Sequence, residues 1–327
     1  MGSVKNDFLL RSPSSQERLR SRIYYLPHFV RNLHAPSLSA GQSEIIEILR
    51  NDGCAVLDGY LAPEVTGRLR HEFEDCLHNL RFRTPALAQS RVDPVRHAQL
   101  LEEHLYASPR QLQRNGLAFT HDEAESYRQV LETFRPSTLT VDMLEYSAAY
   151  RQVWLDPYLL GIVAGYLGMV PRLDQAFVRR NFPAQYRSMN HFWHRDLNND
   201  HHLLKIFFLL SDCDAQNGPH EYVRGSHENL TTLNGQRYYS DEQVDALYAE
   251  SSRERFTGIG KSGMVIIEDT RGLHHARVPT QGYRDMGFAV FTPLRPFYRK
   301  RKYRIPKTAY DGLTPFQKAF IPKPSIA

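Results

Sequence analysis

The chain has 327 residues, of which 41% are hydrophobic and 24% are charged, with a formal net charge of +5 and a sequence pI near 9.0. These values are ordinary for a globular enzyme of one large domain, or of one and a half. A solvated surface explains the mild basic excess, so we do not expect a nucleic-acid partner. Three scattered cysteines, Cys54, Cys76 and Cys213, exclude a disulfide framework and fit a reducing compartment.

No targeting segment is visible in the sequence. The start MGSVKNDFLL lacks an apolar core, and Asn6 stands where a myristoylation signal requires Ser or Thr. The longest apolar run, at 158–170, has 13 residues and is too short to span a bilayer. We therefore predict a cytoplasmic protein without a membrane segment.

The first elements can be predicted from the spacing of apolar residues and from the Gly and Pro residues at element ends. Residues 1–40 are irregular, 41–53 form a short amphipathic helix closed by glycine, and 54–61 form a strand. Residues 62–80 form a helix with Pro63 near its first turn. Its predicted core stripe, at helical spacing, consists of Val65, Leu69, Phe73, Cys76, Leu77 and Leu80.

Residues 82–150 indicate mostly polar helix with Pro and Gly breaks, which would brace a barrel or cap its mouth, and 155–168 indicate a buried helix. Seven or eight short strand candidates follow between 173 and 294, separated by turns. This pattern predicts a mainly β fold with flanking α, built on a double-stranded β-helix of jelly-roll type. We expect a single domain at 41–295, with helical support at 41–172 and the jelly-roll core at 173–295, and a basic C-terminal tail at 296–327.

The stretch 188–228 contains His194-Arg195-Asp196. On a strand, side chains at i and i+2 leave the same face, so His194 and Asp196 would converge while Arg195 points away. With one distant histidine they would form the two-histidine, one-carboxylate triad that suits non-haem Fe(II) oxygenases. A His-x-Asp pair on its own is a common and weak signal.

Two later motifs add context. GPHEYVRGSH follows the apolar strand LLKIFFLLSDC, and SGMVIIEDTRGLHHARVPTQGYRDMGFAVFTPL contains a strand, an Asp-Thr turn, a histidine pair and an arginine. In this order, from about Asp52 to about Arg295, the motifs resemble the phytanoyl-CoA dioxygenase-like family of Fe(II)/2-oxoglutarate-dependent oxygenases. The resemblance implies Fe(II), 2-oxoglutarate as cosubstrate and O2.

The resemblance also implies the remaining site residues. The third ligand would come from a later strand on the opposite side of the barrel, with His227, His274 and His275 as candidates. His274 matches D-T-x-G-x-H and stands ten residues before Arg284, which is the family interval. Arg284 would hold the far carboxylate of 2-oxoglutarate by two parallel hydrogen bonds.

Several other residues are secondary candidates. His191 stands where related enzymes place a polar group that touches cosubstrate or substrate, although a core histidine is an equal alternative. Lys205 either faces the pocket or extends along its edge to solvent. Weaker candidates are assigned elsewhere: Thr270 and Ser226 to turns, Trp193 to the core, Arg277 to the surface, and His201 and His202 to solvent or to a lid.

The predicted function is hydroxylation or another oxidation of a C–H bond in a small-molecule metabolite, in natural-product or secondary metabolism, with release of succinate and CO2. Because Asp196 is retained, hydroxylation is preferred over halogenation. The basic run at 295–307 would suit an anionic substrate but also fits a solvated charge run. A non-catalytic jelly-roll binding protein and a cosubstrate-independent cupin dioxygenase stay open as alternatives, and a homo-oligomer is compatible with the sequence.

Overall fold

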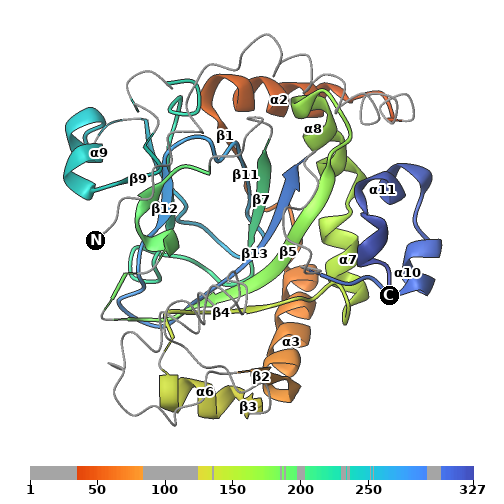
Figure 1. Cartoon of the computed structure of the whole chain (residues 1–327). Helices are drawn as coiled ribbons and strands as arrows, with labels where there is room; N and C mark the ends of the chain where they lie inside the picture. Colours follow the sequence, from red (N-terminus) through yellow and green to blue (C-terminus); the bar gives the residue numbers. More distant parts are fainter. Residues whose placement is uncertain are drawn as a thin grey trace.

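The computed structural model describes residues 35–83, 124–134, 136–184, 186–187, 189–196, 203–229, 233, 236–250, 252, 254–292 and 303–327. In this part of the chain two antiparallel sheets form the body of the molecule (Figure 1). The larger sheet contains, in spatial order, β1 (Cys54–Leu57), β11 (Val265–Glu268), β7 (Leu204–Leu209), β13 (Arg284–Thr292), β5 (Arg172–Asn181) and β4 (Thr138–Val141). The smaller sheet contains β10 (Arg255–Thr257), β8 (His220–Val223), β12 (His274–Ala276), β6 (Trp193–His194) and β9 (Tyr238–Tyr239). A separate pair joins β2 (Arg81–Arg83) to β3 (Ala124–Ser126).

The space between the two sheets holds an apolar cluster to which both contribute. Phe207 and Phe288 come from the larger sheet and Tyr222 from the smaller one. The ring of Phe207 also lies 4.8 Å, centroid to centroid, from that of His220 on β8. Strands with one face toward such a shared interior, joined antiparallel, are the arrangement of a jelly roll. The predicted fold class is confirmed.

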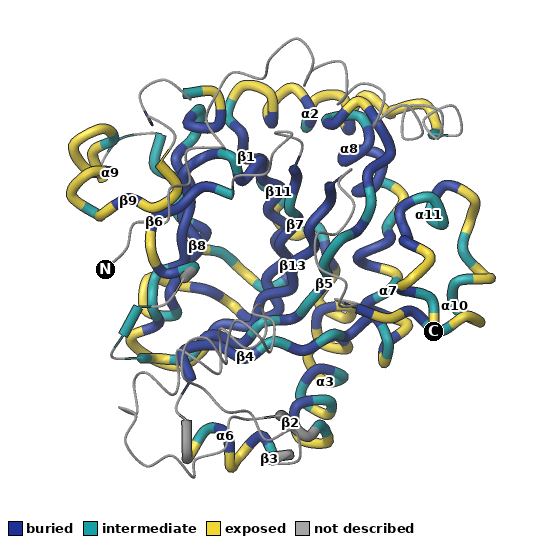
Figure 2. Tube along the Cα trace, viewed as in Figure 1, coloured by how far each residue is buried: buried dark blue, intermediate teal, exposed yellow. Residues whose placement is uncertain are grey.

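Helices cover the outer face of the larger sheet and bury a second, larger core against it (Figures 1 and 2). Those that contribute to this core are α2 (Ala40–Asp52), α3 (Pro63–Asn79), α6 (Tyr127–Phe134), α7 (Ala148–Trp154), α8 (Pro157–Leu167) and α11 (Pro315–Phe320). The other described helices are α9 (Asp241–Leu247), α10 (Lys307–Asp311), η1 (Met189–His191) and η2 (Lys323–Ser325). Helix α9 packs instead on the outer face of the smaller sheet, through Val244.

The ends of α2 and α3 follow the signals in the sequence. Ser39 and Gln42 form a reciprocal capping box at the start of α2, and Gly53 ends the helix with φ of 75°. Pro63 opens α3, where its missing N–H is not needed. The predicted stripe is wrong at Val65, which is 39% exposed, because the buried face of α3 turns through Thr66 instead.

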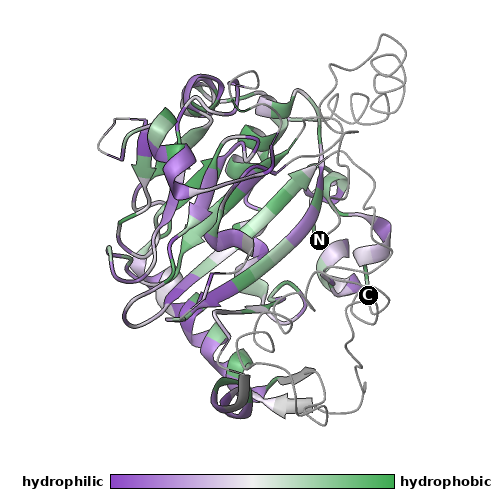
Figure 3. Ribbon diagram, turned by 60° about the vertical axis from the view of Figure 1, so that its left-hand side comes forward, coloured by the Kyte–Doolittle hydropathy of each residue, from purple (hydrophilic) through white to green (hydrophobic). Residues whose placement is uncertain are grey.

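Strand β13 is polar where it begins and apolar along the rest, a change that is visible along the long strands in Figure 3. Arg284 and Asp285 open it and point to opposite faces of the sheet. On the helix side the carboxylate of Asp285 accepts two hydrogen bonds from Arg180, at 2.7 and 2.6 Å. This bidentate pair fixes the strand end from which Arg284 enters the interior.

Some sequence predictions fall on residues outside the described ranges. They include most of the irregular N-terminal segment, residues 84–123 of the section predicted to be polar helix, His201 and His202, and 295–302 of the basic run. In the same polar section, the described strand β4 joins the larger sheet as an edge strand. Residues 303–327 place Phe320 in the core through α11. The predicted division of the chain into segments stays a prediction.

None of the helices within the described ranges is both long and apolar enough to cross a membrane.

Candidate metal and cosubstrate site

His194 and His274 face each other across two neighbouring strands. They are directly opposite in the antiparallel pairing of β6 with β12, and their ring centroids lie 4.2 Å apart. Residues that are opposite in a ladder share a face, and the next residue in this row, Tyr222 on β8, belongs to the interior cluster. Both imidazoles therefore point into the barrel. The expectation that the third ligand comes from the opposite side of the barrel is wrong, because β12 returns beside β6 in the same sheet.

Asp196 completes the group from just beyond the end of β6. Its backbone N–H donates to the carbonyl of Thr270 at 2.8 Å, which fixes the chain in place after the strand ends. Its carboxylate atom Oδ2 lies 3.5 Å from Nε2 of His274. One donor atom from each of His194, Asp196 and His274 lies within 4.8 Å of the other two.

This donor set fits a divalent transition metal. Two imidazole nitrogens and one carboxylate oxygen on one side of a point leave the other side open. Oδ2 of Asp196 is directed toward Nε2 of His274 and toward the ammonium of Lys205, so the carboxylate presents this oxygen where the imidazoles converge. Neither His227 nor His275 belongs to the group that converges here. In His227, the ring atom Nε2 instead lies 3.2 Å from the carbonyl oxygen of Arg50.

The protonation states suit ligation. Burial, with the neighbouring His274 as second cause, lowers the pKa of His194 well below its ordinary value, so the imidazole is neutral. Burial alone would raise the pKa of Asp196, but Lys205 and the two histidines hold it well below the ordinary value. The carboxylate is therefore ionised.

Lys205 reaches Asp196 from the facing sheet. It projects from β7 into the interior, and its ammonium forms an ion pair with Oδ2 of Asp196. Of the two positions considered from the sequence, facing the pocket is the one observed. The ammonium provides the positive charge that holds this carboxylate on the interior side.

Arg284 is a buried cation at the start of β13, with 0% of its surface exposed. Nη1 donates to the carbonyl of Gly218, and Nη2 donates to Oδ1 of Asn181 at 3.3 Å. Burial lowers the pKa of Arg284 to about 10. No carboxylate of the described residues forms an ion pair with it, and its Nε is buried without a hydrogen-bond partner there. A desolvated guanidinium in this state favours an anionic ligand.

His191 ends the short helix η1, and its side chain is buried. Burial lowers its pKa to about 3, with the charges of Arg284 and Arg179 as the next causes. A neutral imidazole close to these cations can accept a hydrogen bond or pack against a bound acid without adding charge.

Sequence reasoning missed a buried acid beside the site. Glu268, at the end of β11, lies opposite Lys205 in register, and its Oε2 is 2.8 Å from Nε2 of His220. Burial raises the pKa of Glu268 to about 8. The available signal was the charged end of an otherwise apolar strand, VIIE, two residues before Thr270.

Comparison with protein families gives one match. The family model "Phytanoyl-CoA dioxygenase (PhyH)" matches residues 49–285. Comparison with curated proteins found no match.

Several solved structures are similar to the chain. The epimerase SnoN from nogalamycin biosynthesis has a TM-score of 0.48 and 16% identity, over 77% of this chain and 83% of that one. EctD from S. alaskensis, with 2-oxoglutarate and 5-hydroxyectoine, has a TM-score of 0.47 and 17% identity, over 82% and 83%. HygX from Streptomyces hygroscopicus, with nickel, 2-oxoglutarate and hygromycin B, has a TM-score of 0.45 and 17% identity, over 80% and 89%.

The family match covers well over half of the chain, and it spans every residue of the candidate site from His191 to Arg284. The chain therefore belongs to the phytanoyl-CoA dioxygenase family of non-haem Fe(II)- and 2-oxoglutarate-dependent dioxygenases.

Proposed function

We propose that His194, Asp196 and His274 bind Fe(II) and that Arg284 binds the distal carboxylate of 2-oxoglutarate. The observation that carries this proposal is the convergence of three donor atoms within 4.8 Å of one another on the wall of a barrel that also buries Arg284. When bound, the metal and cosubstrate supply the oxidising chemistry, in which 2-oxoglutarate is converted to succinate and CO2 as a substrate C–H bond is oxidised.

The residues of the chain provide placement. The two imidazoles and the ionised carboxylate present three ligands on one side. The fork of Arg284 orients a planar carboxylate by two parallel hydrogen bonds, which the point charge of a lysine cannot imitate. His191 would border the same acid and contact the cosubstrate or the substrate.

Aromatic side chains pack together in the interior between the two sheets. Phe207 lies 6.4 Å from Phe288, and Phe288 lies 5.5 Å from Phe177, measured between ring centroids. A dry wall of this kind protects a reactive site from side reactions. We propose a small-molecule metabolite as the substrate and hydroxylation, or a related C–H oxidation, as the outcome. An anionic substrate, a role in natural-product metabolism and a cytoplasmic location stay predictions.

Succinate formation tests the proposal. The protein is supplied with Fe(II), 2-oxoglutarate and O2, with and without a panel of metabolites, and succinate is measured. We expect slow release without substrate and faster release with the right one, both lost in His274→Ala. His71→Ala, which changes an exposed histidine on α3, is the control and should match the unaltered protein. Absence of any 2-oxoglutarate consumption would favour a binding protein, whereas substrate oxidation without 2-oxoglutarate, retained in Arg284→Ala, would favour a cosubstrate-independent dioxygenase.

A further inference from the structure

The residues next to the two metal-binding histidines form a second pair on the other face of the smaller sheet. Trp193 precedes His194 and His275 follows His274, so these neighbours are the next opposed positions of the antiparallel pair. Their rings lie 3.9 Å apart, centroid to centroid, with an interplanar angle of 33°. Both side chains are buried. The outer-face contact therefore lies one residue from the inner-face ligands on both strands.

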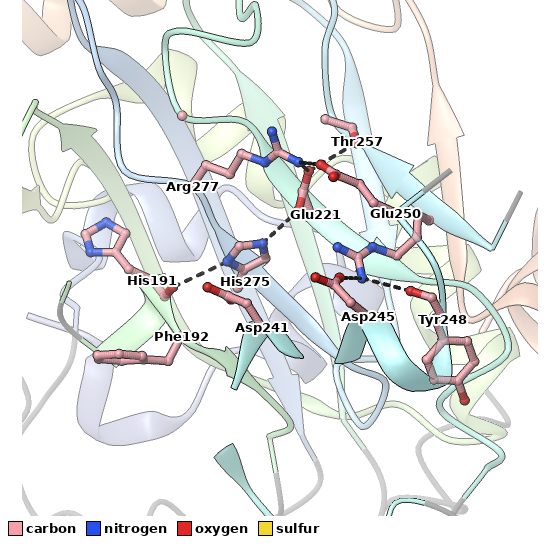
Figure 4. Close-up of polar contacts among 12 residues, drawn as sticks. His191, Phe192, Glu221, Asp241, Asp245, Tyr248, Glu250, Thr257, His275 and Arg277 are labelled. Carbon is pink, nitrogen blue, oxygen red and sulfur yellow. Dashed lines mark hydrogen bonds and ion pairs between the residues drawn. The ribbon is translucent and has the colours of Figure 1, made fainter. Parts of the chain in front are cut away.

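This row continues across the sheet through Glu221 and Thr257 (Figure 4). Glu221 on β8 is opposite His275 and its Oε2 lies 2.8 Å from Nε2 of that ring. Thr257 on β10 is opposite Glu221 and donates to its Oε1 at 3.2 Å. Arg277 pairs with the same oxygen at 2.7 Å. A buried carboxylate is thus held by Thr257 and Arg277 and in turn holds His275.

Backbone pairing joins β6 directly to β12 at one register position, with His194 opposite His274, and the N–H of Asp196 adds a hydrogen bond to the carbonyl of Thr270. The side-chain row adds further contacts between the two strands on the outer face. Nδ1 of His275 also lies 3.3 Å from the carbonyl of His191, which accepts a 2.9 Å hydrogen bond from Nε of Arg187. His275 therefore touches both β6 and the segment that leads into it.

We propose that Trp193, His275 and Glu221 are positioning residues that fix the spacing of the His194 and His274 imidazoles from the outer face of the sheet. This inference rests on the proposed function, because it assigns those two imidazoles to a metal. It gives these three outer-face residues a role in metal affinity as well as in the stability of the fold. Metal-site supports that act through a ligand's surroundings typically change metal affinity by tenfold or more.

Two variants of the full chain test the inference. His275→Phe keeps a ring against Trp193 but removes the contacts to Glu221 and His191, and the larger ring has room because His275 borders a cavity of ≈ 290 Å³. Glu221→Gln keeps the size of the side chain but removes its charge and one acceptor oxygen, so it serves if the first variant fails to fold. The matched control is Glu250→Gln, because Glu250 also pairs with Arg277, at 2.8 Å, but its side chain is 70% exposed.

Mn(II) binding, measured by calorimetry without cosubstrate, is the first readout, and the visible spectrum of the Co(II)-loaded protein is the second. We expect Mn(II) affinity to fall about tenfold in His275→Phe and about threefold in Glu221→Gln. The Co(II) bands should change in both, while Glu250→Gln stays like the unaltered protein.

The outcomes separate this inference from the proposed function. If the unaltered protein binds no Mn(II), the proposed function is wrong and the inference falls with it. If the unaltered protein binds Mn(II) and both row variants match it in affinity and in Co(II) spectrum, only the inference is overturned. A loss of unfolding stability in the row variants with unchanged metal binding also overturns it, because the row would then be purely structural.

Discussion

Replacing Arg284 with methionine should separate stability from cosubstrate binding. Burial lowers the pKa of this guanidinium well below its ordinary value, to about 10. At every pH below about 10 the folded protein therefore disfavours the cation, by about 3 kcal/mol at 1.4 kcal/mol per pKa unit. Removing it leaves the acceptors on Gly218 and Asn181 without their donor, at about 1 kcal/mol each. We expect Arg284→Met to be about as stable as the unaltered protein, or about 1 kcal/mol more stable.

Affinity for 2-oxoglutarate should change in the opposite sense. Two charge-assisted hydrogen bonds contribute about 1.5–3 kcal/mol each, so their loss weakens binding by at least about 100-fold. Urea unfolding of the chelator-treated protein measures the first quantity, and anaerobic titration with Fe(II) and 2-oxoglutarate measures the second.

Arg180→Met is the matched control, because Arg180 is buried with two acid partners, Asp285 and Glu74. It should lose about 3–5 kcal/mol of stability by leaving a buried acid unpaired. If Arg284→Met loses as much stability as Arg180→Met, or keeps its affinity for 2-oxoglutarate, the interpretation of Arg284 as an anion-binding cation is refuted.

Three further predictions concern other parts of the chain. Asp196→Ala should reduce succinate formation by more than about 100-fold, because one of three metal ligands is lost, and normal turnover in a coupled assay would count against the ligand assignment. Although burial opposes it, hydrogen bonds from His275 and the charge of Arg277 lower the pKa of Glu221 to about 2 from 4.5, so its contribution of about 3 kcal/mol is complete above pH 4.5 and is lost as pH falls toward 2. Urea unfolding at pH 7 and pH 3 should show a smaller acid loss in Glu221→Gln, and an unchanged pH dependence would refute this. A Cβ on Gly287 would lie 2.1 Å from the ring of Phe208, so Gly287→Ala should lower stability by about 2 kcal/mol in thermal unfolding. Gly67→Ala, with open space around the added atom in helix α3, should instead gain up to about 1 kcal/mol.

The periodicity of apolar residues and the capping residues at helix ends were enough to predict the elements whose limits are set by the local sequence. Ser39, Gly53 and Pro63 mark the ends of α2 and α3 through local backbone chemistry, which does not depend on the rest of the fold. The two-residue spacing of His194 and Asp196 sets the face of their side chains in the same local way. The interval to Arg284 came from the family resemblance, and the structure places this residue on the neighbouring interior wall.

Features that depend on strand neighbours could not be predicted in this way. Alternation gives the face of a residue but not the strand beside it, so β12 was expected across the barrel from β6. The same reason hides the contact between Trp193 and His275, which the pairing of β6 with β12 sets, and the partner of Lys205, which the packing of the two sheets sets. The prediction for Val65 is wrong because apolar spacing defines the edge of a helix's buried face only to within one residue. The packing of Thr66 decides which residue is buried there.

Anaerobic titration of the full chain with Fe(II) and then 2-oxoglutarate tests the central claim most directly. A chelate of 2-oxoglutarate on the iron produces a weak visible charge-transfer band. We predict that the unaltered protein shows this band with one equivalent of each, and that Asp196→Ala and His274→Ala do not. The absence of a band in the unaltered protein, or its persistence at full intensity in both variants, would contradict the assignment of His194, Asp196 and His274 as the iron ligands.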